Sequence, residues 1–206
     1  MTGAWLFRLW RMLLGWGTVG LVYSVSDRLQ GQGLVMPPGL IDRKITFTPD
    51  AVWLYLSFFL VVPLAYMLTP THRVLWLSRS MSLSAVIAGA VYLMYPTTMI
   101  YPLDQGLTLS SRLLVMLTAV DSAQNCLPSL HMTLMTLAVW GVSHLNRTPV
   151  TILYTAWVIA IAFSTLQLRR HQIADLVSGA LLAMASGWLI YLFRSIKQNW
   201  NKRRAL

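Results

Sequence analysis

Apolar residues in this chain gather in long runs that are separated by short polar stretches. Runs of the length that a helix needs to cross a bilayer recur along the whole sequence. We predict six spans, with ends known to within a few residues, at about 9–26, 51–69, 78–95, 128–145, 148–168 and 172–193. Because the runs follow one another closely, we expect residues 1–206 to form one domain, an all-α integral membrane bundle of six transmembrane helices.

A seventh, shorter pattern lies between the third and fourth runs. Leu107–Leu117 has apolar residues at positions 109, 113, 114, 116 and 117, so this stretch can form an amphipathic helix. We expect this helix to lie on the outer membrane surface, with Arg112 as its one cation. The first run follows Arg8 and Arg11, as in a signal peptide, but no convincing small-residue cleavage site follows it, so a membrane span is favoured.

The composition agrees with a membrane protein. Hydrophobic residues make up 56% of the chain and charged residues 11%, and the mean hydropathy is +0.60. A soluble domain of this length rarely carries so few charges. The single cysteine, Cys126, excludes an internal disulfide.

The charges are distributed unequally between the two sides of the predicted bundle. If both termini are cytoplasmic, ten of the sixteen basic residues lie inside and all six aspartates lie outside. Membrane proteins typically carry an excess of lysine and arginine in their cytoplasmic loops, and this asymmetry follows that rule. We therefore predict a protein of the inner (plasma) membrane of a bacterium. The high pI of 10.4 then reflects membrane anchoring rather than a nucleic-acid partner.

Two of the four histidines fall at the outer starts of predicted spans, whereas His72 and His144 fall at inner helix ends. His171 is followed four residues later by Asp175, and these positions share one face of a helix. The carboxylate can thus orient the imidazole as a nucleophile or base, although the pair would equally fit two polar groups that satisfy each other. The adjacent Arg169 and Arg170 favour an anion site.

The second outer histidine, His131, lies in the stretch "NCLPSLHMTL", Asn125 to Leu134. Pro128 suits the first turn of a helix, and the polar residues before it can cap that helix. Free N–H groups at such a start can hold a phosphate oxygen, and His131 can protonate a leaving oxygen. Both histidines are predicted at the same depth of the membrane, so we expect them to act together.

"PSLH", followed about forty residues later by Ser-Thr, five residues, His, three residues and Asp, resembles the type 2 phosphatidate phosphatase superfamily of lipid phosphatases and phosphotransferases. The resemblance implies a metal-free and cofactor-free enzyme. In it, His171 takes the phosphoryl group, Asp175 orients His171, and His131 protonates the leaving group. Ser129 and Ser164 would contact the phosphate. The Pro-Ser-Leu-His form is similar to the branch that includes inositol phosphorylceramide synthases.

The sequence departs from the superfamily pattern at the cations that usually hold the phosphate. The first motif, a lysine, six residues and Arg-Pro, is missing; Leu130 replaces a glycine; and Thr165 replaces an arginine. The candidates to replace these cations are Arg169, Arg170 and Arg112. Asp121 can hold one of these arginines or cap a short helix.

Three functions remain open at this stage. The first is a phosphatase that acts on a phospholipid or polyprenyl phosphate or diphosphate at the outer leaflet. The second is a headgroup phosphotransferase that uses an alcohol instead of water. The third is a lipid-binding or transport protein on the same fold, which the set of His131, His171 and Asp175 disfavours. No pattern in the sequence indicates the oligomeric state.

Overall fold

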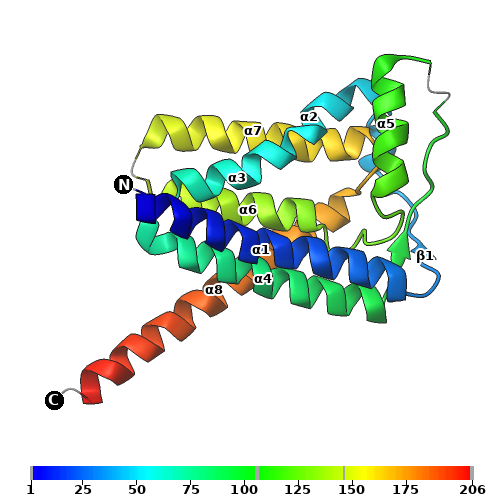
Figure 1. The fold of residues 1–206 in the computed structure, drawn as a ribbon. Coiled ribbons are helices and arrows are strands. Elements are labelled where there is room, and N and C mark those ends of the chain that lie inside the picture. Colours follow the sequence, from blue (N-terminus) through cyan, green and yellow to red (C-terminus); the bar gives the residue numbers. More distant parts are fainter. Residues whose placement is uncertain (1, 105–106, 146, 205–206) are drawn as a thin grey trace.

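Helices account for most of the chain, as the apolar runs predict. The computed structural model describes residues 2–104, 107–145 and 147–204. Figure 1 shows a bundle of elongated helices, with one helix laid across its end and the C-terminal half of the last helix projecting away from it. The helices are α1 (Thr2–Leu29), α2 (Val52–Leu56), α3 (Phe58–Leu68), α4 (Thr71–Met94), α5 (Leu109–Val120), α6 (Leu130–Ser143), α7 (Thr148–Gln167) and α8 (Ile173–Arg204).

Four stretches of the described chain are long and apolar enough to cross a membrane: Pro49–Leu68, Thr71–Met94, Thr148–Gln167 and Ile173–Lys197. They coincide with four of the six predicted spans and indicate a membrane protein. The other two predicted spans lie on α1, of 28 residues, and on α6, of 14 residues. A helix as short as α6 extends only about 21 Å, less than the roughly 30 Å of a bilayer's hydrocarbon core. The count of six spans therefore stays a prediction.

The core of the bundle lies between α3, α4, α6 and α8, and α1 packs along α4. Its largest fully buried side chains include Trp76, Tyr66, Met81, Leu134 and Leu137. Close helix approach depends on small residues, since a Cβ atom built on Gly89 of α4 would lie 2.4 Å from Val22 of α1. Because lipid is as apolar as these side chains, the packing depends on close van der Waals contact between the helices, and it supports one end of the bundle.

The starts of α6 and α8 are in backbone contact. The N–H of Ser129 donates to the carbonyl of Asp175 at 3.1 Å, and the hydroxyl of Thr133 donates to the carbonyl of Gly179 at 2.9 Å. A Cβ atom on Gly179 would lie 2.3 Å from the Ser129 carbonyl oxygen, so only glycine permits this approach. The two helix starts that carry His131 and His171 are thereby held side by side.

Short elements close the same end of the bundle. β1 (Leu34–Val35) pairs in parallel with β2 (Thr97–Thr98), which joins the loop after α1 to the loop after α4. The 3-10 helices η1 (Asp42–Lys44) and η2 (Pro49–Ala51) follow β1. The predicted amphipathic helix is α5, which crosses the end of the bundle (Figure 1). Its buried residues Ser110, Ser111, Leu114 and Leu117 form one face.

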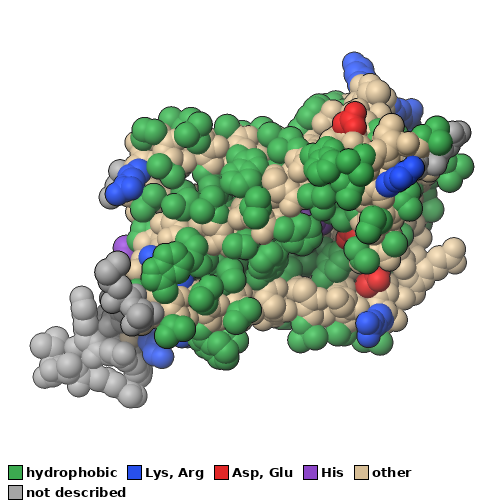
Figure 2. All heavy atoms as spheres, turned by 45° about the horizontal axis from the view of Figure 1, so that its top comes forward, with side chains coloured by type: hydrophobic (Ala, Val, Ile, Leu, Met, Phe, Trp, Pro, Cys, Tyr) green, Lys and Arg blue, Asp and Glu red, His purple; other side chains and the backbone are tan. Residues whose placement is uncertain are grey.

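The two ends of the bundle differ in their charged side chains. In Figure 2 apolar side chains cover much of the visible flank, basic side chains lie at both ends, and acidic side chains lie toward the end with α5. All six aspartates belong to the segments at that end, which are the end of α1, η1, η2, the loops around α5 and the start of α8. We call it the histidine end, and the opposite one the basic end.

Candidate active site

His171 lies in the tight turn between α7 and α8. Arg169 adopts a left-handed conformation there, with φ of 55°, which costs a non-glycine residue on the order of 1–3 kcal/mol. Its guanidinium offsets this cost by donating to the carbonyls of Asp42 and Ile45, both at 2.6 Å. The carboxylate of Asp42 in turn accepts from the N–H of Ile173 at 2.9 Å, at the start of α8. The loop with η1 and the turn before α8 are therefore fastened to each other.

His131 is the second residue of α6. The Ser129 hydroxyl caps this helix by accepting from the N–H of Met132 at 3.3 Å. Nδ1 of His131 lies 3.2 Å from Nε2 of His171, so the two rings are in hydrogen-bond contact. The structure thus brings together two histidines that are forty residues apart in sequence.

Asp175 lies beside the other nitrogen of His171. Its Oδ2 atom is 3.5 Å from Nδ1 of His171, within ion-pair range but long for a hydrogen bond, and both side chains are buried. The same oxygen accepts from the N–H of Gln172 at 2.8 Å. A carboxylate in this position stabilises positive charge on the His171 ring and leaves Nε2 facing His131.

The structure also reveals a partner of His131 that the sequence did not indicate. The hydroxyl of Tyr55, from α2, lies 2.9 Å from Nε2 of His131 and 3.2 Å from Oδ2 of Asp121. Tyr55 is 1% exposed, so both contacts are shielded from water. His131 is therefore held at both ring nitrogens, by His171 on one side and by Tyr55 on the other.

Asp121 is the centre of a buried polar cluster. It accepts from the hydroxyl of Tyr23 at 2.6 Å, from Tyr55, and from Arg170 at 2.9 Å. Burial alone would raise the pKa of Asp121, but the Arg170 guanidinium and then His131 outweigh it and hold the pKa below its usual value. The same ion pair overcomes the effect of burial on Arg170 and raises the pKa of that guanidinium. Arg170 also lies over the Tyr101 ring, 4.9 Å from its centroid.

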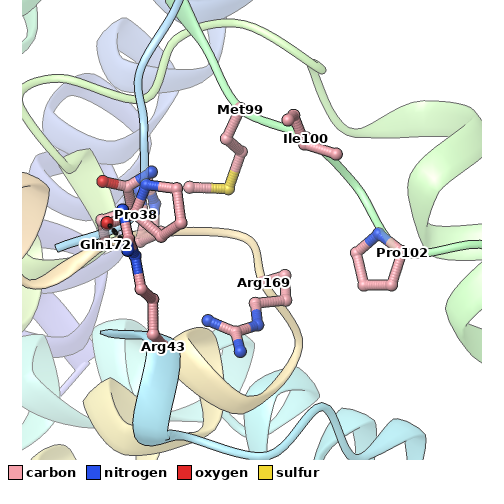
Figure 3. Close-up of a pocket in the computed structure, with 8 residues that line it drawn as sticks. Pro38, Arg43, Met99, Ile100, Pro102, Arg169 and Gln172 are labelled. Atoms are coloured by element: carbon pink, nitrogen blue, oxygen red, sulfur yellow. Dashed lines mark hydrogen bonds between the residues drawn. The ribbon is translucent and has the colours of Figure 1, made fainter. Parts of the chain in front are cut away.

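A cavity of about 400 Å³ opens beside His171. Figure 3 shows Arg43 and Arg169 reaching it from η1 and from the turn before α8, with Met99, Ile100 and Pro102 from the loop after β2 opposite them. Arg43 is exposed and makes one side-chain hydrogen bond, from Nε to the Pro38 carbonyl at 3.1 Å. The cavity is therefore a cationic space next to a histidine.

A second cavity, of about 220 Å³, lies on the other side of the histidine pair. It includes His131 and Asp121, and its other lining residues are mostly aromatic or aliphatic. They are Trp16, Val19, Gly20, Tyr23, Ser24, Tyr55, Phe58, Phe59, Leu117, Val120, Leu130 and Leu134. The two histidines thus touch each other while each lines a different cavity, one cationic and one apolar.

The residues predicted to bind phosphate are dispersed. Arg169 lines the cationic cavity, but Arg170 is paired with Asp121 and does not. Ser129 and Ser164 are fully buried; Ser129 caps α6, and the Ser164 hydroxyl donates to the Ile161 carbonyl at 2.6 Å. Arg112 is exposed on α5 and lines neither cavity.

Arg43 and Tyr55 were not predicted as site residues, and the sequence offered no distinguishing signal for either. Arg43 is one of two adjacent cations in the segment between the first two apolar runs, and Tyr55 is an aromatic residue in an apolar run. Among the described residues no group of three His, Cys, Asp or Glu side chains could hold a metal ion.

Comparison with protein families gives one match: the profile described as the PAP2 superfamily matches residues 103–199. This region is just under half of the chain and contains α5, α6, α7 and most of α8. It includes His131, His171 and Asp175, whereas Arg43 and Tyr55 lie outside it. Searches among curated proteins and among solved structures each gave no match.

Proposed function

We propose that this chain is a PAP2-superfamily enzyme that removes the phosphate from a membrane lipid phosphate or diphosphate through a phosphohistidine. Members of that superfamily are phosphatases or phosphotransferases, and the match supports this reaction class. The observation that carries the proposal is the position of the histidine pair between two unlike cavities. The cationic cavity suits a phosphoryl group, and the apolar cavity suits the hydrocarbon part of the leaving alcohol.

The proposed reaction has two steps. Nε2 of His171 attacks phosphorus, the bond from phosphorus to the lipid oxygen breaks, and Nδ1 of His131 gives that oxygen a proton. Water then attacks the phosphohistidine while His131 takes a proton from it, which releases inorganic phosphate and restores both rings. Asp175 stabilises the positive charge on His171 in both steps. Because in-line attack places the leaving oxygen opposite the nucleophile, substrate must separate the two nitrogens that now lie 3.2 Å apart.

Tyr55 gives His131 its orientation in this scheme. A neutral imidazole carries one N–H, and the group bonded to its other nitrogen decides which nitrogen that is. The Tyr55 hydroxyl gives its single proton to Asp121, so its oxygen accepts from Nε2–H of His131 and keeps the N–H of the neutral ring on that nitrogen. The proton that His131 gives to the leaving oxygen is then the second proton of the imidazolium, on Nδ1, toward His171 and the reacting phosphoryl group. Tyr55 is therefore a positioning residue for the general acid, whereas Asp175 has that role for the nucleophile.

The cations for the phosphate are, in this proposal, Arg43 and Arg169. Both line the cavity next to His171, and they come from segments fastened together through Asp42. They replace the lysine and arginines that the superfamily pattern would place elsewhere. Arg170 supports the site indirectly, because it fixes the position of Asp121 and so of Tyr55.

A headgroup phosphotransferase is the second candidate. The cavity of about 400 Å³ is larger than a phosphoryl group needs, so an alcohol acceptor has room to replace water in the second step. The Pro-Ser-Leu-His form of the motif also resembles the branch that contains transferases. Release of inorganic phosphate from a lipid phosphate, measured with and without glycerol or inositol, separates the two functions.

The roles of the histidines are tested by trapping and by leaving-group dependence. Acid quench with a ³²P-labelled substrate should trap the phosphoryl group on His171, and His171→Ala should form no phosphoenzyme with any substrate. His131→Ala should lose alkyl phosphate hydrolysis but keep part of its activity on an aryl phosphate, whose leaving group needs little protonation. Trapping on His131, or rescue of His171→Ala by the aryl phosphate, would contradict the proposal.

A further inference from the structure

A third cavity lies at the basic end of the bundle, far from the histidine pair. It has a volume of about 230 Å³ and lies between the start of α4 and the C-terminal half of α8. Its lining residues are His72, Arg73, Trp76, Tyr191, Arg194 and Ser195. Because α4 has 24 residues, this cavity is separated from the histidine end by roughly 36 Å of helix.

Two guanidinium groups line the cavity without a carboxylate partner in the described chain. Arg73 lies over the Tyr191 ring, 5.7 Å from its centroid, and Arg194 donates to the carbonyl of His72 at 2.9 Å. The salt bridges of the described residues involve neither arginine, since all six aspartates belong to the histidine end. The charge of Arg73 and Arg194 is therefore uncompensated within this part of the structure.

The start of α4 adds to the positive potential of the cavity. The first turn of this helix contains no acidic residue, and its N-cap, Pro70, provides no side-chain acceptor. Free N–H groups and the helix dipole at such a start favour an anion. The start of α4 and the two guanidinium groups therefore all favour a negatively charged ligand.

The cavity also lies at the level expected for lipid headgroups. The apolar stretches of α4 and α8 that are long enough to span a membrane begin at Thr71 and end at Lys197, next to the cavity. Beside it, α8 exposes Trp188 and Tyr191, one helical turn apart, which are 60% and 48% exposed. An amphiphilic ligand can place an anionic head in the cavity and its chains against this face of α8.

We propose that this cavity binds the phosphate group of an anionic phospholipid in the leaflet opposite to the histidine pair. Arg73 and Arg194 contact the phosphate oxygens, and the exposed aromatic residues of α8 contact the acyl chains. The site is separate from the reaction, so the proposal holds or fails independently of the proposed function.

Binding to the purified full chain in detergent tests this proposal. Native mass spectrometry and thermal unfolding are measured with dihexanoyl-phosphatidylglycerol, with the zwitterionic dihexanoyl-phosphatidylcholine, and with inorganic phosphate at equal concentration. We expect the anionic lipid to bind and raise the Tm, and the other two to have little effect. Arg73→Gln and Arg194→Gln should each weaken binding about tenfold, as expected for loss of one charge-assisted contact.

Arg147→Gln is the matched control, because Arg147 is exposed at the same end and does not line the cavity. It should bind the anionic lipid as the unmodified chain does. If Arg147→Gln weakened binding of the anionic lipid as much as the cavity variants do, the binding would come from general charge attraction, and the proposed site would be wrong. Equal effects of phosphate and the anionic lipid would overturn the lipid assignment, as would equal effects of both lipids. If Arg73→Gln does not fold, Arg194→Gln decides, since the Arg194 side chain is exposed.

Discussion

Replacing Tyr55 by phenylalanine should damage protonation of the leaving group while leaving the nucleophile intact. The change removes one hydroxyl and with it the contacts to Nε2 of His131 at 2.9 Å and to Asp121 at 3.2 Å. Since Tyr55 is 1% exposed, water cannot easily take the place of that hydroxyl. The buried Nε2–H of His131 is left without its acceptor, and the imidazolium loses its link through Tyr55 to the Asp121 carboxylate.

The size of the effect follows from these contacts. An unsatisfied buried polar group costs about 1–3 kcal/mol, which corresponds to roughly 5–150-fold in rate if the whole cost falls on the transition state. The full contribution of a general acid is about 10²–10⁴-fold. We therefore expect kcat on an alkyl phosphate to fall about 10–100-fold in Tyr55→Phe, less than in His131→Ala, with little change in KM.

The assay compares an alkyl phosphate with an aryl phosphate in each variant. Aryl phosphate hydrolysis should fall much less in Tyr55→Phe, and in a His131→Ala background the same change should have no further effect on kcat. Tyr154→Phe is the control, because Tyr154 is also a buried tyrosine and donates to the Val61 carbonyl at 2.6 Å, away from the histidines. It should lower the Tm without changing the ratio of the two activities. Equal losses on both substrates in Tyr55→Phe would refute the positioning role.

Three further predictions concern the phosphate cations, pH and topology. Arg43→Ala should lower phosphatase kcat/KM by about 10²–10³-fold, whereas Ala at the neighbouring Lys44 should have little effect; an unchanged rate in Arg43→Ala would exclude this cation. The pKa of Asp121 is lower in the folded protein than the unfolded value near 3.8, so its stabilisation is present above that value and lost as pH falls through the folded pKa. The Tm difference between the unmodified chain and Asp121→Asn should therefore stay constant from pH 7 down to about pH 5 and shrink as the pH falls below about 4, where the unfolded carboxyl group takes up its proton, and a difference that stays constant down to about pH 3 would contradict the ion-pair origin. In a background without Cys126, Leu103→Cys, at a position 99% exposed near the histidine end, should react with an impermeant maleimide in intact cells; labelling only after lysis would reverse the predicted orientation.

The sequence predicted the elements of this structure better than their contacts. Apolar run length predicted the helices, because a chain in lipid must satisfy its backbone groups within each segment. The four-residue spacing likewise placed Asp175 near His171, although His171 lies in the turn before α8 and not on the helix itself. The predicted topology, in which both helices start on the same side, placed His131 at the same level. These features depend on residues that are close in sequence or on one repeated pattern.

The remaining site residues depend on contacts between distant segments. Tyr55 reaches His131 only because α2, packed against α5 and α7, carries its side chain to the start of α6. Nothing in an apolar run distinguishes this tyrosine from any other. Arg170 seemed to be a phosphate cation, but the fold gives it Asp121 as a partner, 49 positions away in sequence. Arg43 enters the site because the η1 loop is fastened to the turn before α8. No spacing rule connects such pairs, so only the three-dimensional arrangement identifies them.

The missing side chain at Gly179 has a consequence for which changes the histidine end can tolerate. The distance between the two reactive nitrogens is set by how closely two helix backbones approach, and that approach is limited by a single hydrogen atom at position 179. A methyl group there would push the helix starts apart even though it touches neither histidine. The spacing of the two histidines is therefore a property of helix packing, whereas the loop residues that line the cationic cavity, such as Met99, Ile100 and Pro102, can be changed without altering that spacing.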